Sequence, residues 1–149
     1  MDYEIDVDEA LQGGSERQLF LVWDIPSERR MWQGAREHAR QGGNAEHEQA
    51  AENALGELPD VSALQALSAN KRLVELLTGR RWFVMQQARE EGASWSEIGE
   101  ALGMSKQAAH DWYRRKIEHQ EKYAPDFHDA ARARAVLDEP HVSAATVDE

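Results

Sequence analysis

The chain contains no cysteine, which excludes disulfide bonds and thiolate metal sites. Long apolar runs are also missing. The longest, Leu19 to Trp23, is far shorter than the about 20 residues needed to span a bilayer. The first residues are acidic and lack the basic and apolar regions of a signal peptide. We therefore expect a cytoplasmic protein with no membrane contact.

Signals of catalysis are scarce as well. The six histidines show no zinc-type spacing, and the sequence has no glycine-rich phosphate loop and no nucleophile elbow. Acidic residues are abundant, but nothing in the sequence places a pair of them in a cleft. We expect no metal, no cofactor and no enzymatic activity.

Basic charge is in short supply, since the 149 residues carry a net charge of -11. Residues 1–70 hold 5 Lys/Arg against 14 Asp/Glu, and residues 123–149 hold 2 against 6. Residues 71–122 hold 10 against 8, so this central part alone is not acidic. If the chain binds nucleic acid, residues 71–122 are where a basic surface is expected.

The pattern of apolar and turn-forming residues predicts an all-α fold: a small helical bundle containing a helix-turn-helix, with disordered acidic termini. We divide the chain into four regions. These are a disordered acidic N-terminus (1–16), a helical region suited to dimerisation or partner binding (17–58), a helix-turn-helix domain (59–122) and a mostly flexible acidic tail (123–149).

In the second region, Pro26 predicts a break after the apolar run Leu19 to Trp23. A helix follows over 28–41, ended by Gly42 and Gly43, and Asn44 caps another that reaches Leu55. The apolar run has two interpretations. It is an anchor for a partner's groove, or it packs on the protein's own bundle.

Pro59 and Asp60 open the next predicted helix, which Thr78 and Gly79 end. Its expected buried stripe is Val61, Leu64, Leu67, Val74 and Leu77, beside Leu73 and Leu76. Another helix is predicted over 80–91 and closed by Gly92, with buried candidates Trp82, Phe83, Val84, Met85 and Ala88. A short helix near 126–137 is a further option.

The most specific pattern begins at Ser94. Ser94 and Glu97 have the spacing of a capping box, and Gly103 supplies a turn residue that tolerates positive φ. Gly99 is small where the two helices approach, and Ser105 caps the second helix. The expected inner face consists of Ile98, Ala101, Leu102, Met104, Ala108, Ala109 and Trp112. A short helix, a tight turn and a second capped helix make a helix-turn-helix.

The segment from Ala88 to His110 resembles the helix-turn-helix of small bacterial regulators of the actinobacterial type. It is also similar to the promoter-reading region of sigma factors. The resemblance covers about a fifth of the chain and implies binding of double-stranded DNA. Residues 1–60 resemble no family known to us.

In such motifs, the N-terminal and outward residues of the second helix face the base edges, and nearby basic residues hold phosphates. Gln pairs well with adenine, and Lys reaches guanine or a phosphate. Asp111 is unfavourable beside phosphates unless it accepts from a cytosine amine or pairs with a neighbouring arginine. The candidate DNA-binding residues are Ser105, Lys106, Gln107, His110, Arg114, Arg115, Lys116, Arg80 and Arg81.

These patterns favour a sequence-specific transcriptional regulator that acts as a homodimer on two half-sites. The alternative is a protein-interaction adaptor, whose helix-turn-helix contacts RNA polymerase or another protein of transcription or the nucleoid. The net charge of -11 supports that alternative.

Overall fold

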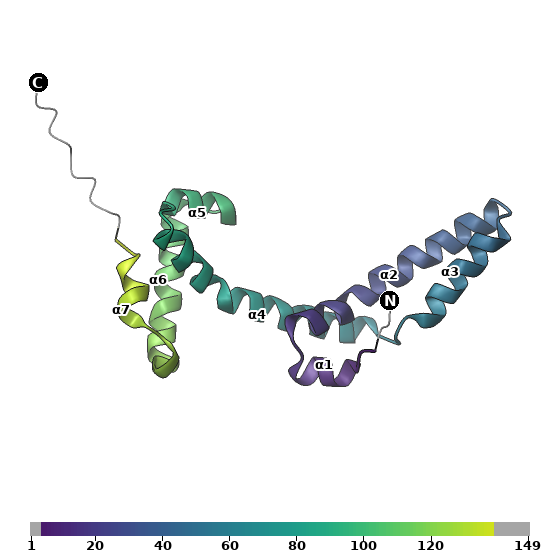
Figure 1. The fold of residues 1–149 in the computed structure, drawn as a ribbon, viewed down its shortest axis with the longest axis horizontal. Helices are drawn as coiled ribbons and strands as arrows, with labels where there is room; N and C mark the ends of the chain where they lie inside the picture. Colours follow the sequence, from purple (N-terminus) through teal and green to yellow (C-terminus); the bar gives the residue numbers. More distant parts are fainter. Residues whose placement is uncertain (1–3, 139–149) are drawn as a thin grey trace, which may run out of the picture. The chain divides into compact units, whose positions relative to one another are not determined.

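The computed structural model describes residues 4–138, and every regular element in this range is helical. The all-α expectation is therefore confirmed. No helix in the described range combines the length and the apolarity that a membrane crossing requires. Figure 1 shows the elements, which are α1 Val7–Gly13, α2 Glu16–Gln41, α3 Ala45–Glu57, α4 Ala63–Glu90, α5 Trp95–Leu102, α6 Lys106–Tyr123, the 3₁₀ turn η1 Pro125–Phe127 and α7 Ala130–Ala135.

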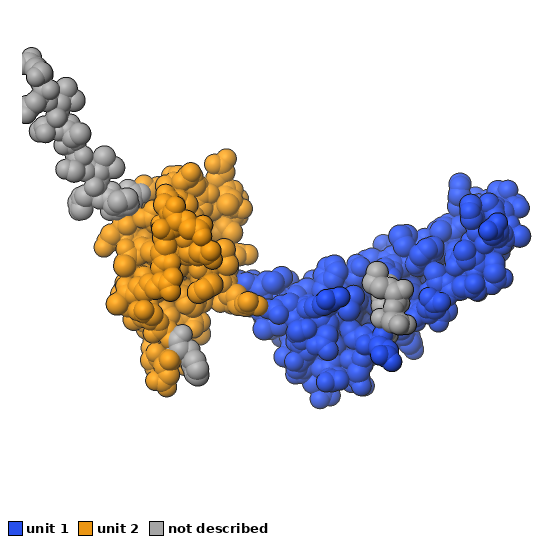
Figure 2. All heavy atoms as spheres, viewed as in Figure 1, with its two compact units in different colours: residues 1–78 blue, residues 79–149 orange. Residues whose placement is uncertain are grey.

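The chain forms two compact units, residues 1–78 and 79–149 (Figure 2). Their boundary falls inside the continuous helix α4, and within the range 59–122 that the sequence suggested as one region. The expected break at Thr78 and Gly79 is wrong, because Gly79 sits inside α4. A glycine within a helix lowers its stability by only about 1 kcal/mol relative to alanine, too little to end a helix held by packing.

Unit 1 (residues 1–78) is built on the antiparallel pair α2 and α3. The turn between them follows the sequence signals. Gly43 has a φ of 66°, which glycine adopts without a Cβ clash. The Asn44 side chain accepts a hydrogen bond from the His47 N–H, as an N-cap does. These two local signals correctly predicted where the first helix ends and where the second begins.

Helix α2 runs through Pro26, so the predicted break there is wrong. It begins earlier, at a capping box formed by Ser15 and Gln18. Proline in a helix removes one backbone hydrogen bond and crowds the preceding turn. Here Leu19, Val22 and Ile25 are buried along one side of α2, and this burial outweighs the local penalty.

The N-terminal segment is more ordered than expected, because residues 7–13 form α1 instead of part of a disordered stretch. Asp6 caps α1 and Ala10 is fully buried in the core of unit 1. From α4, the Arg72 guanidinium donates hydrogen bonds to the carbonyl oxygens of Leu11 (3.1 Å) and Gln12 (2.9 Å). A cation at the C-terminal end of a helix also interacts favourably with the negative end of the helix dipole.

The core of unit 1 corrects the predicted face of α4. Ala66, Ala69 and Leu73 of α4 lie in one buried core with Leu19, Val22 and Ile25 of α2, and Val61 is also buried, whereas four residues of the expected stripe are exposed. The sequence offered two sets of apolar residues on α4, and the set that contains Ala66 and Ala69 is the buried one. The exposed residues are Leu64, Leu67, Val74 and Leu77.

Unit 2 (residues 79–149) contains the end of α4, followed by α5, α6, η1 and α7. Gly92 follows α4 with a φ of 99°, as predicted. The short helix offered near 126–137 is present as α7, preceded by η1, so residues 125–138 hold more regular structure than a mostly flexible tail. Residues 139–149 lie outside the described range, as do residues 1–3 of the predicted disordered N-terminus.

Four side chains that were predicted to be buried in unit 2 are exposed. Phe83, Val84, Ala101 and Ala108 are exposed, while Trp82, Ala88 and Trp112 are partly buried. A periodic pattern shows that apolar residues recur, but not which of several possible partners covers them. The buried set is Met85, Trp95, Ile98, Ala109, Tyr113, Ile117, Ala133 and Val136.

The contact from Arg72 yields a first prediction. We expect Arg72→Met to loosen α1, because the carbonyl groups of Leu11 and Gln12 lose a charged donor. Amide hydrogen exchange of residues 7–13 measures the effect, and exchange there is expected to accelerate about tenfold or more. The control is Arg36→Met, which removes an exposed pair with Glu52 on α3. Equal exchange of residues 7–13 in both variants would contradict the assigned role.

Candidate nucleic-acid interface

Helix α5 is fixed at its start by the predicted capping box. The Ser94 hydroxyl accepts from the Glu97 N–H at 3.1 Å, and the Glu97 carboxylate accepts from the Ser94 N–H at 2.7 Å. The hydrogen bonds from Ser94 lower the pKa of Glu97 below its ordinary value. Trp95 and Ile98 are buried on the inner side of α5, so the helix is both capped and packed.

The turn after α5 depends on two glycines. Gly103 ends the helix with φ 66° and ψ 33°, the left-handed conformation that glycine adopts most readily. A Cβ on Gly99 would lie 2.7 Å from the Met104 carbonyl oxygen and 3.0 Å from the Ser105 carbonyl. The Met104 N–H also donates to the Gly99 carbonyl at 2.8 Å. The sequence predicted this close approach, and the structure shows that Gly99 contacts the turn backbone.

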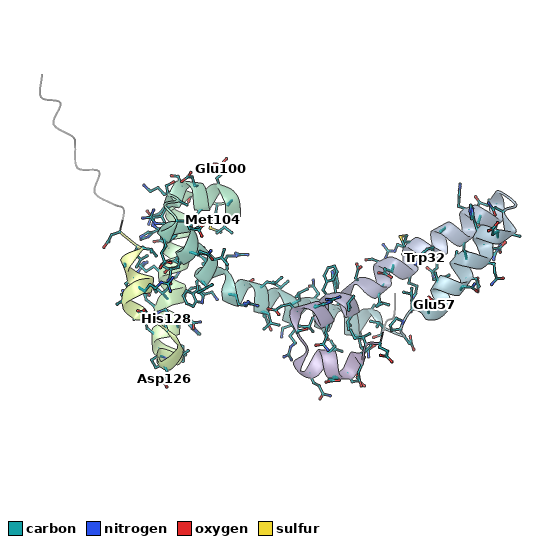
Figure 3. The ribbon with its side chains drawn as sticks, in the orientation of Figure 1. Trp32, Glu57, Glu100, Met104, Asp126 and His128 are labelled. Atoms are coloured by element: carbon teal, nitrogen blue, oxygen red, sulfur yellow. The ribbon has the colours of Figure 1, made fainter. Side chains whose placement is uncertain are left out.

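Helix α6 starts immediately after this turn. The Ser105 hydroxyl accepts from the Ala108 N–H at 3.0 Å, as predicted for its N-cap. The buried side of α6 consists of Ala109, Tyr113 and Ile117, at the four-residue spacing of one helix face. Figure 3 labels Glu100 and Met104, which lie on the two sides of Gly103. The pair α5 and α6 thus presents the first turn of α6 to solvent.

Five of the candidate DNA-binding residues are exposed on α6 or at its cap, namely Ser105, Lys106, Gln107, Arg114 and Arg115. Asp111 lies among them and is partly neutralised. It accepts a hydrogen bond from Gln107 at 3.0 Å, and its carboxylate is 3.7 Å from the Arg114 guanidinium. Arg114 is also 3.6 Å from Glu118. The exposed side of α6 therefore carries both signs of charge.

His110 is used within the fold. Its Nε2 lies 3.1 Å from the Leu137 carbonyl oxygen, and its ring packs edge-on against Trp95 at 5.2 Å. Trp95, Lys106, Gln107, His110 and Leu137 together line a cavity of about 200 Å³ beside the first turn of α6. His110 is half-buried there, so it is less accessible than the outward position assigned to it from the sequence.

The remaining basic candidates lie elsewhere in unit 2. Arg81 from α4 and Lys116 from α6 each place their charge 5.4 Å from the Trp112 ring centroid. Such cation–π contacts add about 0.5–1 kcal/mol at exposed sites. Arg80 is exposed on α4. Trp112 is therefore a platform for two cations and only partly a core residue.

Sequence reasoning missed the contacts through which α7 supports α6. The buried Tyr113 hydroxyl donates to the Ala133 carbonyl oxygen of α7 at 2.6 Å, and burial raises the pKa of this hydroxyl. Two bidentate ion pairs flank this contact. Arg132 of α7 binds Glu90 and Arg134 binds Glu121, with all four N–O distances between 2.7 and 2.8 Å. Charge patterning alone gave no sign of these partners, which are far apart in sequence.

Arg89 joins two other segments of unit 2 to α4. Its guanidinium donates to the carbonyl oxygens of Ala93 at 2.8 Å, Val136 at 3.0 Å and Asp138 at 2.9 Å. The same guanidinium lies 5.4 Å from the Trp95 ring centroid. One side chain therefore connects the end of α4, the start of α5 and the segment after α7.

Comparisons with protein-family models, with curated proteins and with solved structures found no match to this chain.

The tight turn yields a second prediction. Gly99→Ala is expected to lower the free energy of unfolding of unit 2 by about 1–3 kcal/mol, because backbone atoms surround the added methyl group. The control is Gly79→Ala inside α4, where a Cβ meets no atom within 4 Å. That variant is expected to stabilise the chain by about 0.5–1 kcal/mol. Thermal unfolding followed by circular dichroism measures both, and shifts of the same sign would contradict the assignment.

The ion pairs of α7 yield a third prediction. Hydrogen bonds from Arg132 and Arg134 hold the pKa values of Glu90 and Glu121 below the ordinary value. The pairs therefore stabilise the fold fully above the unfolded glutamate pKa of about 4.3, and this stabilisation is lost as the pH falls through the lowered folded values. Relative to wild type, Glu90→Gln/Glu121→Gln is expected to melt at lower temperature at pH 7, with the difference shrinking below about pH 4.

The matched control for this pH dependence is Glu46→Gln/Glu100→Gln, which changes two exposed acids outside these pairs. Its melting temperature relative to wild type is expected to stay nearly constant with pH. If Glu90→Gln/Glu121→Gln melts at the same temperature as the wild type at pH 7, the stabilising role of the two pairs is contradicted.

Proposed function

We propose that this chain binds double-stranded DNA through α5 and α6, which act as a helix-turn-helix with α6 as the recognition helix, and that it regulates transcription. The observation that carries the proposal is the first turn of α6. Its position is fixed by Gly99, Gly103 and the Ser105 cap, while Lys106 and Gln107 at its start are exposed. This is the part of a recognition helix that reads base edges.

The charges on and around α6 favour binding to DNA phosphates, but only with modest affinity. A helix N-terminus carries a partial positive charge and attracts phosphate. Arg114 and Arg115 extend this positive charge along the exposed side, and Arg81 and Lys116 add two cations at Trp112. Asp111 and Glu118 oppose it, and the whole chain has a net charge of -11. We therefore propose two copies per site, because one recognition helix contacts few base pairs.

The fourth prediction tests DNA binding directly. Lys106→Ala/Gln107→Ala/Arg114→Ala is expected to weaken binding to a duplex by about tenfold or more, because it removes two charges and the best base-reading side chain. Wild-type binding is expected to weaken steeply between about 50 and 200 mM salt, and the variant is expected to have the shallower salt dependence. Fluorescence anisotropy with genomic fragments, and then with selected sequences, measures both quantities.

The matched control is Arg36→Ala/Arg40→Ala/Gln49→Ala in unit 1, which likewise removes two positive charges and one glutamine from the surface of helices. It is expected to bind duplex as the wild type does. Two results would sink the proposal: no duplex binding by the wild type at low salt, or equal losses in the two triple variants.

A second function has its own support. Phe20, Trp23 and Met31 are exposed on α2 although the neighbouring Leu19 and Val22 are buried, so the apolar run divides between core and surface. Exposed aromatic and Met side chains favour protein contacts, as does the net charge of -11. On this alternative the chain is an adaptor for RNA polymerase or another transcription protein. The adaptor alternative predicts that the chain does not bind a duplex. It also predicts that Phe20→Lys/Trp23→Lys abolishes binding to the protein partner, whereas the α6 triple variant still binds it.

A further inference from the structure

The cavity of about 200 Å³ beside the first turn of α6 has walls of one chemical kind. None of the five described residues that line it is acidic, and Lys106 adds a positive charge at its edge. The first turn of α6 also carries the positive end of the helix dipole. The cavity is therefore suited to a negatively charged group. Its lining residues are Trp95, Lys106, Gln107, His110 and Leu137.

Trp95, which forms one wall of the cavity, lacks an acceptor. This residue is 1% exposed, and its indole N–H is buried without a hydrogen-bond partner among the described residues 4–138. A buried N–H without an acceptor is unfavourable. An occupant that brings carbonyl or carboxylate oxygens to this wall is therefore favoured over one that brings further donors.

The described part of the chain ends at this cavity. Helix α7 lies beside α6 (Figure 1), and Leu137 after α7 is one of the lining residues. The Leu137 carbonyl oxygen lies 3.1 Å from His110 Nε2, and the Arg89 guanidinium donates to the Asp138 carbonyl oxygen at 2.9 Å. Consecutive Cα atoms are about 3.8 Å apart, so residue 139 follows within about 8 Å of Leu137.

The segment that follows, residues 139–149, has the opposite charge to the exposed side of α6. It contains three acidic residues and no Lys or Arg. On α6, Arg114 already pairs with Asp111 and Glu118, so we expect the segment to be attracted mainly to Lys106 and Arg115. The three acids are Glu139, Asp148 and Glu149.

The segment is also long enough to cover this surface. Eleven residues span at most about 36 Å when extended. Lys106 and Arg115 are separated by about 14 Å along the helix axis. Apart from its acids, the segment consists mainly of small side chains, which suit a cavity of about 200 Å³.

We propose that residues 139–149 bind across this cavity and the first turn of α6, with their carboxylates at Lys106 and Arg115. A short tether holds such a segment at an effective concentration of about millimolar, so DNA has to displace it. The docking stands on unit 2 alone. Its regulatory consequence, competition with DNA for Lys106, rests on the proposed function.

Nuclear magnetic resonance of the full chain without DNA tests the docking. Glu139→Gln/Asp148→Asn/Glu149→Gln is expected to shift the Trp95 indole N–H and the amides of residues 105–107, because the segment loses the charges that hold it there. The amides of α3 are expected to stay in place. Added salt is expected to move the wild-type resonances towards those of the variant, because salt screens exposed charges.

The matched control is Glu46→Gln/Glu57→Gln/Asp60→Asn, which neutralises three exposed acids of unit 1. It is expected to leave the resonances of Trp95 and residues 105–107 as in the wild type. The differences are also expected to survive a dilution of about tenfold, because an intramolecular contact does not depend on concentration. Loss of the differences on dilution indicates that the segment binds a second copy, and overturns the proposal.

Fluorescence anisotropy with a duplex tests the competition. At about 50 mM salt, Glu139→Gln/Asp148→Asn/Glu149→Gln is expected to bind about threefold or more tighter than the wild type, and the unit 1 control is expected to bind as the wild type does. The advantage is expected to shrink at higher salt. Equal affinities of wild type and both variants overturn the competition.

The two measurements separate this proposal from the proposed function. A wild type that binds no duplex, but whose resonances shift as expected, overturns the proposed function and leaves the docking intact. Duplex binding by the wild type, with unchanged resonances of Trp95 and residues 105–107 in the variant, overturns the docking alone. In that case the cavity is left to another occupant, such as a DNA phosphate.

Discussion

The candidate interface depends on the close approach of Gly99 to the backbone of Met104 and Ser105. The absence of a side chain at this position lets the turn return against α5, and the left-handed Gly103 directs the chain into α6. Ser94 and Ser105 then cap the two helices so that their first turns stay formed. Every property proposed for α6 requires this turn, because an exposed side chain reads a partner only when its backbone is held in place.

The sequence predicted best the features that are decided by near neighbours in the chain. The Ser94 capping box and the Asn44 cap involve residues three apart, and Gly43, Gly92 and Gly103 each satisfy a local need for positive φ. Pro26 and Gly79 misled because local penalties of a few kcal/mol were outweighed by burial elsewhere. For α4, the pattern contained two sets of apolar residues. Only the tertiary packing of unit 1 decides that Ala66 and Ala69 are buried and Leu67 is not.

The features of the candidate site also divide into those that the sequence predicts and those that depend on residues far away in the chain. Exposure of Lys106, Gln107 and Arg114 follows from helix periodicity once the inner face is known. The engagement of His110 with Trp95 and Leu137 depends on a segment 27 residues later in the chain. The ion pairs of Arg132 and Arg134 likewise bring acids and bases together from distant helices. Many acidic residues do not preclude specific ion pairs between acids and bases. Net charge alone is therefore a poor guide to what one helix binds.

Arg89 has a consequence for the recognition of relatives. Its three carbonyl acceptors surround one planar guanidinium that also lies over the Trp95 ring. Lysine carries a single ammonium group and does not reproduce a planar fork of donors, so a change from arginine to lysine is not conservative here. Arginine at this position, tryptophan six residues later and glycine ten residues later form a spaced signature of the fold. A distant homologue that keeps these three residues is expected to keep the turn, even where its charged surface has changed completely.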